Sequence, residues 1–273
     1  MNGASAKFLA AALAACTSFC CAAAARPPSD TPTPSSASSP GAAAGVGLTS
    51  YSGTGCVEMA LVRSVSLDAL RAMVPARHKL SPGADGAGQL STALYSCDGV
   101  GIDDGPRTRA VIGEIGIRIE SPDGTPGRHS YLLYHVTDLK PLAEVLGKLS
   151  GRFRYAPAAS FSVGQRAPGA ENTARGSIES DGVAFSIIGD PVKEPAASPV
   201  AHDAKGVTFW VDSPRGQIRV DYRAPQILPR STGALTVKFM RADSALQQFG
   251  ETGSGTGAFL RFDSKVLVNV VPL

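Results

Sequence analysis

The sequence predicts a mainly β (α+β) fold: an antiparallel barrel or strongly bent sheet with two short packing helices. Segments with the two-residue alternation of strands outnumber helical segments, and they do not alternate with helices as in parallel βαβ folds. Residues 51–273 suit one such domain in length, because barrels and sandwiches of roughly 200–250 residues commonly form a single unit. We therefore expect one β-barrel-like domain over these residues.

The first residues predict export. Phe8–Ala12 is an apolar run behind Lys7, and it is shorter than the about 20 residues that a transmembrane helix needs. The following Leu13-Ala14-Ala15-Cys16 resembles the lipobox of bacterial lipoproteins, which implies a signal peptide over residues 1–15 and a lipid on Cys16. A second interpretation stays open, in which residues 1–25 are an ordinary secretory signal cleaved within Ala22–Ala25.

The segment after the signal predicts a tether. Residues 16–50 are rich in Pro, Ser and Ala and hold few large apolar side chains, so they bury too little surface to offset their ordering entropy. A spacer of this kind suits a domain that stands off a bilayer. We expect a lipoprotein anchored in the cell envelope by its N-terminal lipid, with a soluble secreted protein as the alternative.

Composition and motifs exclude several partners. The chain has 26 Lys and Arg against 23 Asp and Glu, a near balance that gives no electrostatic reason to expect nucleic-acid binding. The glycine-rich run 253–257 lacks the lysine of a phosphate-binding loop, and the four histidines show no metal-ligand spacing. No cofactor or metal is predicted, and the oligomeric state stays open.

Two cysteines lie beyond the signal region. Cys56 and Cys97 predict a disulfide in an oxidising compartment, and the bond would contribute roughly 4 kcal/mol by the chain-entropy argument. Two buried free thiols are the alternative. A zinc pair lacks its third and fourth ligands.

The elements follow in order along the domain. Ser66 predicts the cap of a short helix that Pro75 ends, and an apolar stripe predicts a second helix over residues 138–149. Residues 243–249 suit a third, short helix, and residues 190–205 are a proline-rich loop. Strand patterns occupy residues 56–65, 89–97, 109–120, 129–136, 159–163, 173–179, 183–188, 207–212, 217–223, 234–240, 258–262 and 265–271.

One hairpin carries the first candidate ligand-binding side chains. The turn 121–125 joins strands 109–120 and 129–136, and an odd-numbered loop would place Glu114, Arg118 and Tyr134 on one face. An acid, a base and a phenol could orient a small ligand in an apolar cavity. The other interpretation is that Glu114 and Arg118 form a solvated pair opposite an isoleucine-rich face.

Trp210 is a further candidate. A three-residue turn over residues 213–216 would place its indole on the face of Ile218 and Val220. Core packing is favoured over ligand stacking, since large aromatic side chains commonly fill barrels.

The order of these pieces resembles the acetoacetate decarboxylase superfamily. The resemblance runs through Val65–Pro75, Gly113–Ile117, His135–Asp138 and Gly151–Tyr155. It implies a glutamate, here Glu114, on a strand that lines a central cavity. It also implies a Gly-aromatic-Pro-Lys-Lys run where this chain has Gly151–Tyr155.

The sequence departs from that family at the lysine. The decarboxylases form a Schiff base there, whereas Arg152 and Arg154 carry guanidinium groups that stay protonated and are poor nucleophiles. Lys148 lies at the end of a predicted helix, where a solvated cation is the simpler interpretation. We therefore expect no acetoacetate decarboxylase activity.

Three functions stay open. The missing lysine favours a protein without catalytic activity that binds a small, partly apolar molecule. The first alternative is an envelope enzyme, a lyase, cyclase or hydrolase, with Glu114 as acid or base. The second alternative is an anchored interaction module with a filled core.

Overall fold

The computed structural model describes residues 49–164, 173–189, 206–214, 216–224, 227–241, 244–249 and 253–271. The predicted signal, Cys16, nearly all of the tether and the whole proline-rich loop 190–205 lie outside these residues. The strands are β1 (Thr49–Val65), β2 (Gly88–Ile102), β3 (Thr108–Ile119), β4 (Arg128–Thr137), β5 (Phe153–Tyr155), β6 (Ala158–Gly164), β7 (Thr173–Ser180), β8 (Val183–Gly189), β9 (Val207–Ser213), β10 (Gly216–Arg223), β11 (Ile227–Arg241) and β12 (Gly253–Val271). The helices are α1 (Leu67–Arg71), α2 (Lys140–Gly147) and α3 (Ser244–Gln247).

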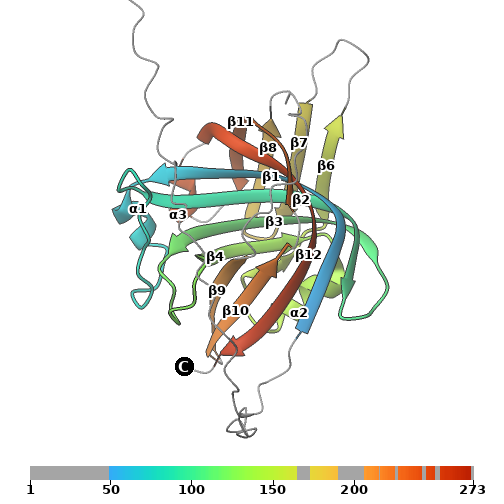
Figure 1. Ribbon diagram of the computed structural model, residues 1–273, viewed down its shortest axis with the longest axis horizontal. Helices are drawn as coiled ribbons and strands as arrows, with labels where there is room; N and C mark the ends of the chain where they lie inside the picture. The colour runs from blue at the N-terminus through green and yellow to red at the C-terminus, as the bar shows by residue number, and fades with distance from the viewer. Residues whose placement is uncertain are drawn as a thin grey trace, which may run out of the picture. The chain divides into compact units, whose positions relative to one another are not determined.

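The strands close into a barrel, which confirms the predicted fold class. The order β1-β2-β3-β4-β9-β10-β12 returns to its start because β1 also pairs with β12 (Figure 1). All of these pairs are antiparallel except β4 with β9, which run parallel from Arg128↔Val207 to Tyr131↔Trp210. The sheet is therefore mixed. No local pattern predicts this parallel pair, because segments distant in the chain form it.

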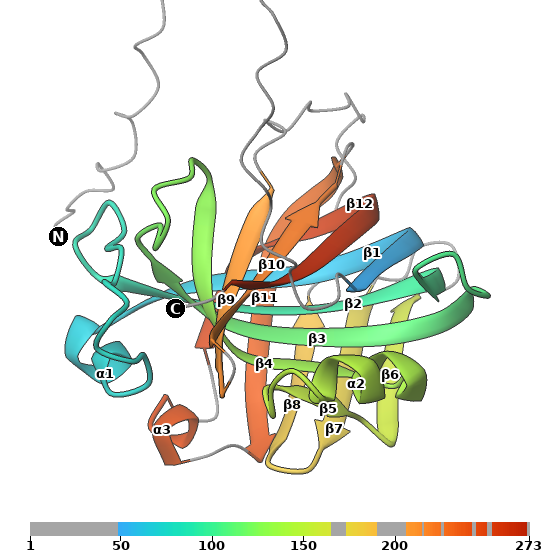
Figure 2. The ribbon, with the colours of Figure 1, turned by 90° about the horizontal axis from the view of Figure 1, so that it is seen from below.

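A second group of strands lies against the barrel. β12 also pairs with β11, and the order of paired strands goes on through β8, β7 and β6. Figure 2 shows these strands beneath β1, β2 and β3. An intersheet core fills the space between the two groups and includes Met59, Leu94, Ile115, Phe185 and Trp210. Alternation along β1 to β4 sends every other side chain into this core and the rest into the barrel.

The barrel core is the second cluster. It contains side chains from all seven barrel strands, and α2 and β5 add Leu142, Leu146 and Phe153. Leu142 and Leu146 are fully buried, which fits the packing role predicted from the apolar stripe of this helix. The described helices are too short and too polar to cross a membrane.

The short elements agree with their local signals. The Ser66 hydroxyl accepts a hydrogen bond from the Ala69 amide at 3.2 Å, so this residue caps α1 as predicted. Pro141 lies in the first turn of α2, and Gly124 takes a φ of 73° in the turn between β3 and β4. These three elements are confirmed with ends shifted by a few residues.

The strands are longer than the sequence predicted. β1 begins at Thr49, seven residues before the predicted start, and β12 is one strand where two were expected. β1 and β12 each have a paired strand on both edges. This pairing extends the two strands through residues of low strand propensity. β5 was not expected as a strand, because its three residues pair with β4 only after α2 returns the chain.

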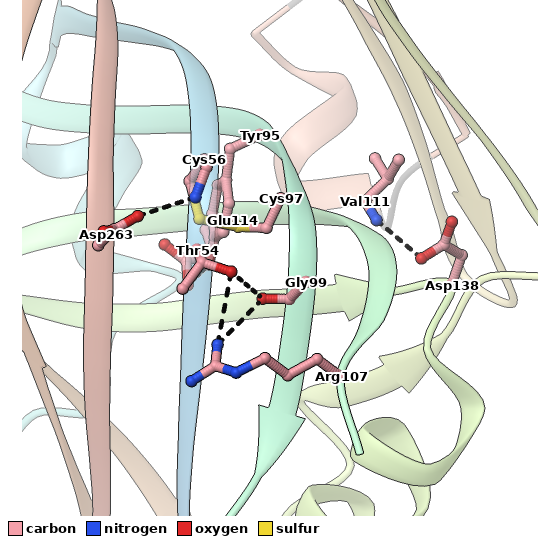
Figure 3. Close-up of a disulfide and its surroundings, with 11 residues drawn as sticks. Thr54, Cys56, Tyr95, Cys97, Gly99, Arg107, Val111, Glu114, Asp138 and Asp263 are labelled. Atoms are coloured by element: carbon pink, nitrogen blue, oxygen red, sulfur yellow. Dashed lines mark hydrogen bonds between the residues drawn. A yellow bond between two sulfur atoms is a disulfide. The ribbon is translucent and has the colours of Figure 1, made fainter.

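The predicted disulfide is confirmed. Cys56 and Cys97 are bonded with a Cα–Cα distance of 3.9 Å, and the bond joins the adjacent strands β1 and β2. Both side chains belong to the barrel core. Figure 3 shows the bond beside Tyr95 and Glu114, so the crosslink fixes the strands that carry the candidate site.

Candidate functional site

Glu114 lies inside the barrel. Its side chain is 9% exposed, and Oε1 accepts hydrogen bonds from the Tyr95 hydroxyl at 3.2 Å and from Nδ1 of His135 at 3.0 Å. The three residues come from β2, β3 and β4, which are neighbours in the sheet. Two donors on one oxygen hold the carboxylate in place and stabilise its charged form.

The face sharing predicted for Tyr134 is wrong. The β3–β4 register shifts between Ile115↔Tyr134 and Gly116↔Leu132, so Leu133 is an extra residue that reverses the alternation. Tyr134 therefore packs in the intersheet core. His135 lies beside Glu114 at the place that was predicted for Tyr134. No glycine or proline marks this bulge, so the sequence carried no signal for it.

Arg118 follows the predicted alternation but does not join this cluster. It lies near the end of β3 and donates a hydrogen bond to Oε1 of Gln89 at 2.9 Å. Three residues separate it from Glu114 along the strand. The structure places it at the partly exposed end of the same face.

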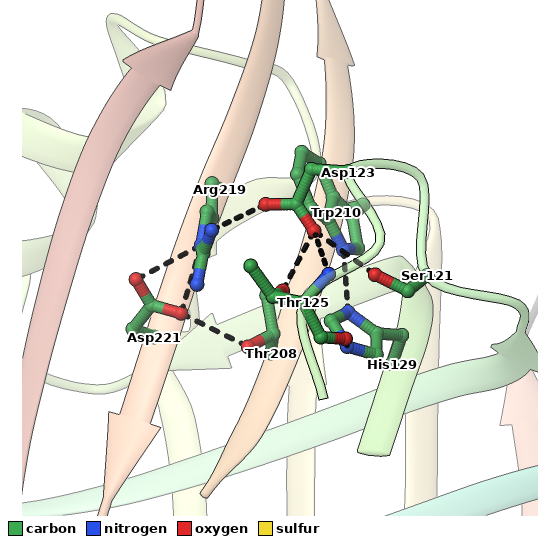
Figure 4. Close-up of polar contacts among 8 residues, drawn as sticks. All are labelled: Ser121, Asp123, Thr125, His129, Thr208, Trp210, Arg219 and Asp221. Carbon is green, nitrogen blue, oxygen red and sulfur yellow. Dashed lines mark hydrogen bonds and ion pairs between the residues drawn. The ribbon is translucent and has the colours of Figure 1, made fainter. Parts of the chain in front are cut away.

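Trp210 packs in the intersheet core, 1% exposed. Ser213 pairs with Gly216, so the turn has two residues where three were predicted, and Trp210 shares its face with Arg219 and not with Ile218. Its indole N–H donates to Nδ1 of His129 at 3.1 Å (Figure 4). The neighbouring Arg219 contacts both Asp123 and Asp221, which ties the β3–β4 turn to β10.

Sequence reasoning missed Glu58. This residue lies two positions after Cys56 on β1, pairs across the sheet with Tyr95, and is half-buried. Burial and, as a smaller cause, the nearby Glu114 charge together raise the pKa of Glu58 to about 8. Alternation from Cys56 would have placed Glu58 on the disulfide face, so the signal was present in the sequence.

Three phenols complete the polar cluster. Burial, followed by the Glu114 charge, raises the pKa of Tyr51, Tyr95 and Tyr222 well above that of a free tyrosine. The three side chains therefore stay neutral at physiological pH. We call Glu58, Glu114 and His135, together with these tyrosines, the barrel cluster.

One nitrogen of this cluster lacks a partner. Nε2 of His135 is buried without a hydrogen bond, whereas the hydroxyls of Tyr51 and Tyr222 lie close to that of Tyr95, and Tyr222 lies close to Ser264 as well. A buried polar atom without a partner costs free energy, so Nε2 indicates a place for a polar ligand.

Exposure of the inward face of β1 rises with distance from the disulfide. On the inward face of β1, Val62 is 55% exposed, whereas Ala60 and Glu58 are half-buried and Cys56 is buried. Ala93, on the same face of β2, is also half-buried. Small side chains thus lie between solvent and Glu58.

The segment Gly151–Tyr155, which resembles the lysine-bearing run of the family, contains β5. Phe153 points into the barrel core, with its ring 5.6 Å from that of His135. Arg152 and Arg154 lie outside, with guanidinium carbons 5.9 and 5.0 Å from the ring centre of Tyr134. The lysines among the described residues, Lys79, Lys140, Lys148, Lys238 and Lys265, are all exposed.

Metal chemistry has no evident site in the described part of the chain. No group of three or more His, Cys, Asp or Glu side chains there is arranged to hold a metal ion.

Solved structures share this architecture. Acetoacetate decarboxylase from Legionella pneumophila subsp. pneumophila str. Philadelphia 1 matches with a TM-score of 0.56 and 10% identity, over 81% of this chain and 86% of that chain. The chain has the acetoacetate decarboxylase-like fold. An acetoacetate decarboxylase-like enzyme from Sphingomonas wittichii RW1 matches with a TM-score of 0.53 and 12% identity, over 83% and 94% of the two chains.

A third match has a different named role. MppR, an enduracididine biosynthesis enzyme solved with pyruvate, matches with a TM-score of 0.54 and 17% identity, over 81% of this chain and 88% of that chain. Comparison with protein-family models gives no match, and comparison with curated sequences gives none either.

These matches correct the expectation of a protein without catalytic activity. The solved structures that share the acetoacetate decarboxylase-like fold are enzymes, MppR and the decarboxylases among them. The expectation rested on the missing lysine, which bears on one reaction and not on catalysis in general, and on the apolar strands, which an enzyme of this fold also has.

The elevated pKa of Glu58 predicts a pH dependence of stability. The folded chain holds this proton up to about pH 8, whereas the unfolded chain releases it near pH 4.5. Between these values the free energy of unfolding should fall as the pH rises, by up to about 1.4 kcal/mol per pH unit, and it should level off above pH 8. Denaturant unfolding at several pH values gives the free energy of unfolding of the wild type and of Glu58→Gln. The difference between their slopes against pH is the contribution of Glu58.

The control is Glu120→Gln. Glu120 follows β3, its side chain is 58% exposed, and its nearest cation is Lys79 at 4.0 Å. We expect this variant to keep the wild-type slope. Equal slopes in the wild type and in Glu58→Gln would contradict the raised pKa.

Proposed function

We propose that this protein is an enzyme that transfers protons to and from a small, partly apolar molecule held inside the barrel. Glu114 acts as the base and Glu58 as the acid. The observation that carries the proposal is the barrel cluster, in which two carboxyl groups face one interior and Glu114 is held by Tyr95 and His135. Two carboxyl groups in different environments that face one interior can serve as the acid and the base of a proton-transfer site.

The chemistry suited to this pair is a lyase-type elimination. Glu114 takes a proton from the ligand, the electrons of that bond form a double bond, and an oxygen leaving group departs with the proton of Glu58. Glu58 can donate because its pKa of about 8 keeps it protonated at neutral pH. Neither step needs an amine nucleophile, which agrees with the exposed positions of the described lysines.

His135 positions the base. Its Nδ1 donates to Glu114, while its ring lies against Tyr51 and Phe153 at centroid distances of 6.1 and 5.6 Å. These contacts fix the ring and with it the carboxylate. The solved complex of MppR with pyruvate supports the use of this fold for small oxygen-bearing molecules.

Replacement of Glu114 tests the proposal. The full mature protein is incubated with an extract of small metabolites, and mass spectrometry follows which of them is consumed. We expect Glu114→Gln to slow that reaction about 10²–10⁴-fold, because the amide cannot accept the proton. Glu120→Gln should leave the rate unchanged. Undiminished turnover by Glu114→Gln would refute the assignment.

We further propose that the enzyme is exported and anchored by a lipid on Cys16, with free secretion as the alternative. The Leu13–Cys16 sequence and the Cys56–Cys97 disulfide support export, since disulfides persist in oxidising compartments. Mass spectrometry of the mature N-terminus should find a lipid-modified Cys16, and Cys16→Ser should move the protein from the membrane to the soluble fraction. An unmodified N-terminus within residues 22–26 would instead establish free secretion.

A further inference from the structure

Among the described residues, no lysine or arginine is bonded to a carboxyl group of the barrel cluster. Glu114 is bonded to Tyr95 and His135, and Tyr51, Tyr222 and Glu58 lie close enough for its charge to act on them. Arg118, the described cation on this face, lies near the end of β3 and is bonded to Gln89. A buried carboxylate is costly unless a counter-charge or strong hydrogen bonds compensate it, so the interior favours an incoming positive charge.

The free nitrogen of His135 is a hydrogen-bond acceptor when the ring is neutral. The Glu114 carboxylate can only accept, so Nδ1 of His135 carries the proton in their 3.0 Å contact. In the neutral ring Nε2 then has a lone pair, and this atom is buried without a partner in a side chain that is 3% exposed. A ligand with an N–H group would supply the missing donor.

Aromatic rings surround the same space. Tyr95, Tyr222 and Phe262 pack edge to face, with centroid distances of 5.9 to 6.3 Å. Their neutral rings offer faces that attract cations and edges that pack against apolar groups. Rings and carboxyl groups together suit a cation with an apolar part.

We propose that the molecule bound in the barrel carries a positively charged nitrogen with at least one N–H, as in an ammonium or guanidinium group attached to an apolar body. The proposal rests on the function given above and narrows its substrate class. The charge interacts with Glu114, the N–H is donated to Nε2 of His135, and the apolar body packs on the three rings. A carboxylate ligand would be repelled by Glu114.

Binding of such a cation should release a proton. Glu58 is protonated at neutral pH because its pKa is about 8. A positive charge nearby stabilises the ionised carboxylate and lowers that pKa, so up to about one proton leaves as the ligand binds.

Calorimetry with three probes of equal size tests the proposal on the full mature protein. The probes are n-butylammonium, 1-butanol and butyrate, measured at low salt and pH 7 in two buffers of different ionisation enthalpy. We expect n-butylammonium to bind at least tenfold more tightly than 1-butanol, butyrate to bind more weakly still, and only the cation to release a proton. Equal binding of cation and alcohol, preference for butyrate, or no binding of n-butylammonium would overturn the proposal.

Variants locate the effect. Glu58→Gln should still prefer the cation but lose the proton release, Glu114→Gln should lose at least tenfold of the preference, and Glu120→Gln should behave as the wild type. Circular dichroism confirms that each variant is folded. If the metabolite consumed in the turnover assay is neutral or anionic, the enzyme assignment stands and this inference fails. If cations bind but Glu114→Gln keeps full turnover, the inference stands and the assigned base is wrong.

Discussion

Two carboxyl groups that share the interior of one closed barrel are the constraint on which this account depends. The adjacent strands β1, β2 and β3 bring Glu58, which pairs with Tyr95, close to Glu114, which pairs with Ala93 on the same face of β2. Both groups cannot be ionised there at low cost, so one keeps its proton. The protein thereby holds an acid and a base a short distance apart at the same pH.

The rest of the fold supports this arrangement. The disulfide fixes β1 against β2 beside the cluster, and α2 and β5 bring Phe153 against His135. The Arg219 contacts on the outer face tie the β3–β4 turn to β10. Compared with the lysine-based chemistry of the family that the sequence resembles, this chain has the barrel and a glutamate inside it, and it carries Arg152 and Arg154 in the segment where the resemblance implies the lysine.

Local signals predicted much of the fold, because caps, turns and alternation act over a few residues. Ser66, Gly124 and the cysteine pair show this. The sequence could not predict the bulge at Leu133, which no special residue marks, or the parallel β4–β9 pair. These two features decide which side chains meet, so His135 replaced Tyr134 in the site. Glu58 was predictable by counting from Cys56, whereas its raised pKa depends on the closed barrel.

Neutron diffraction from a deuterated crystal at pH 7 would test the central claim most directly, because it locates the protons of the barrel cluster. We predict deuterium on the Glu58 carboxyl and on Nδ1 of His135, and none on Glu114 or on Nε2 of His135. An ionised Glu58, or a deuterium on Glu114, would contradict the assignment of acid and base.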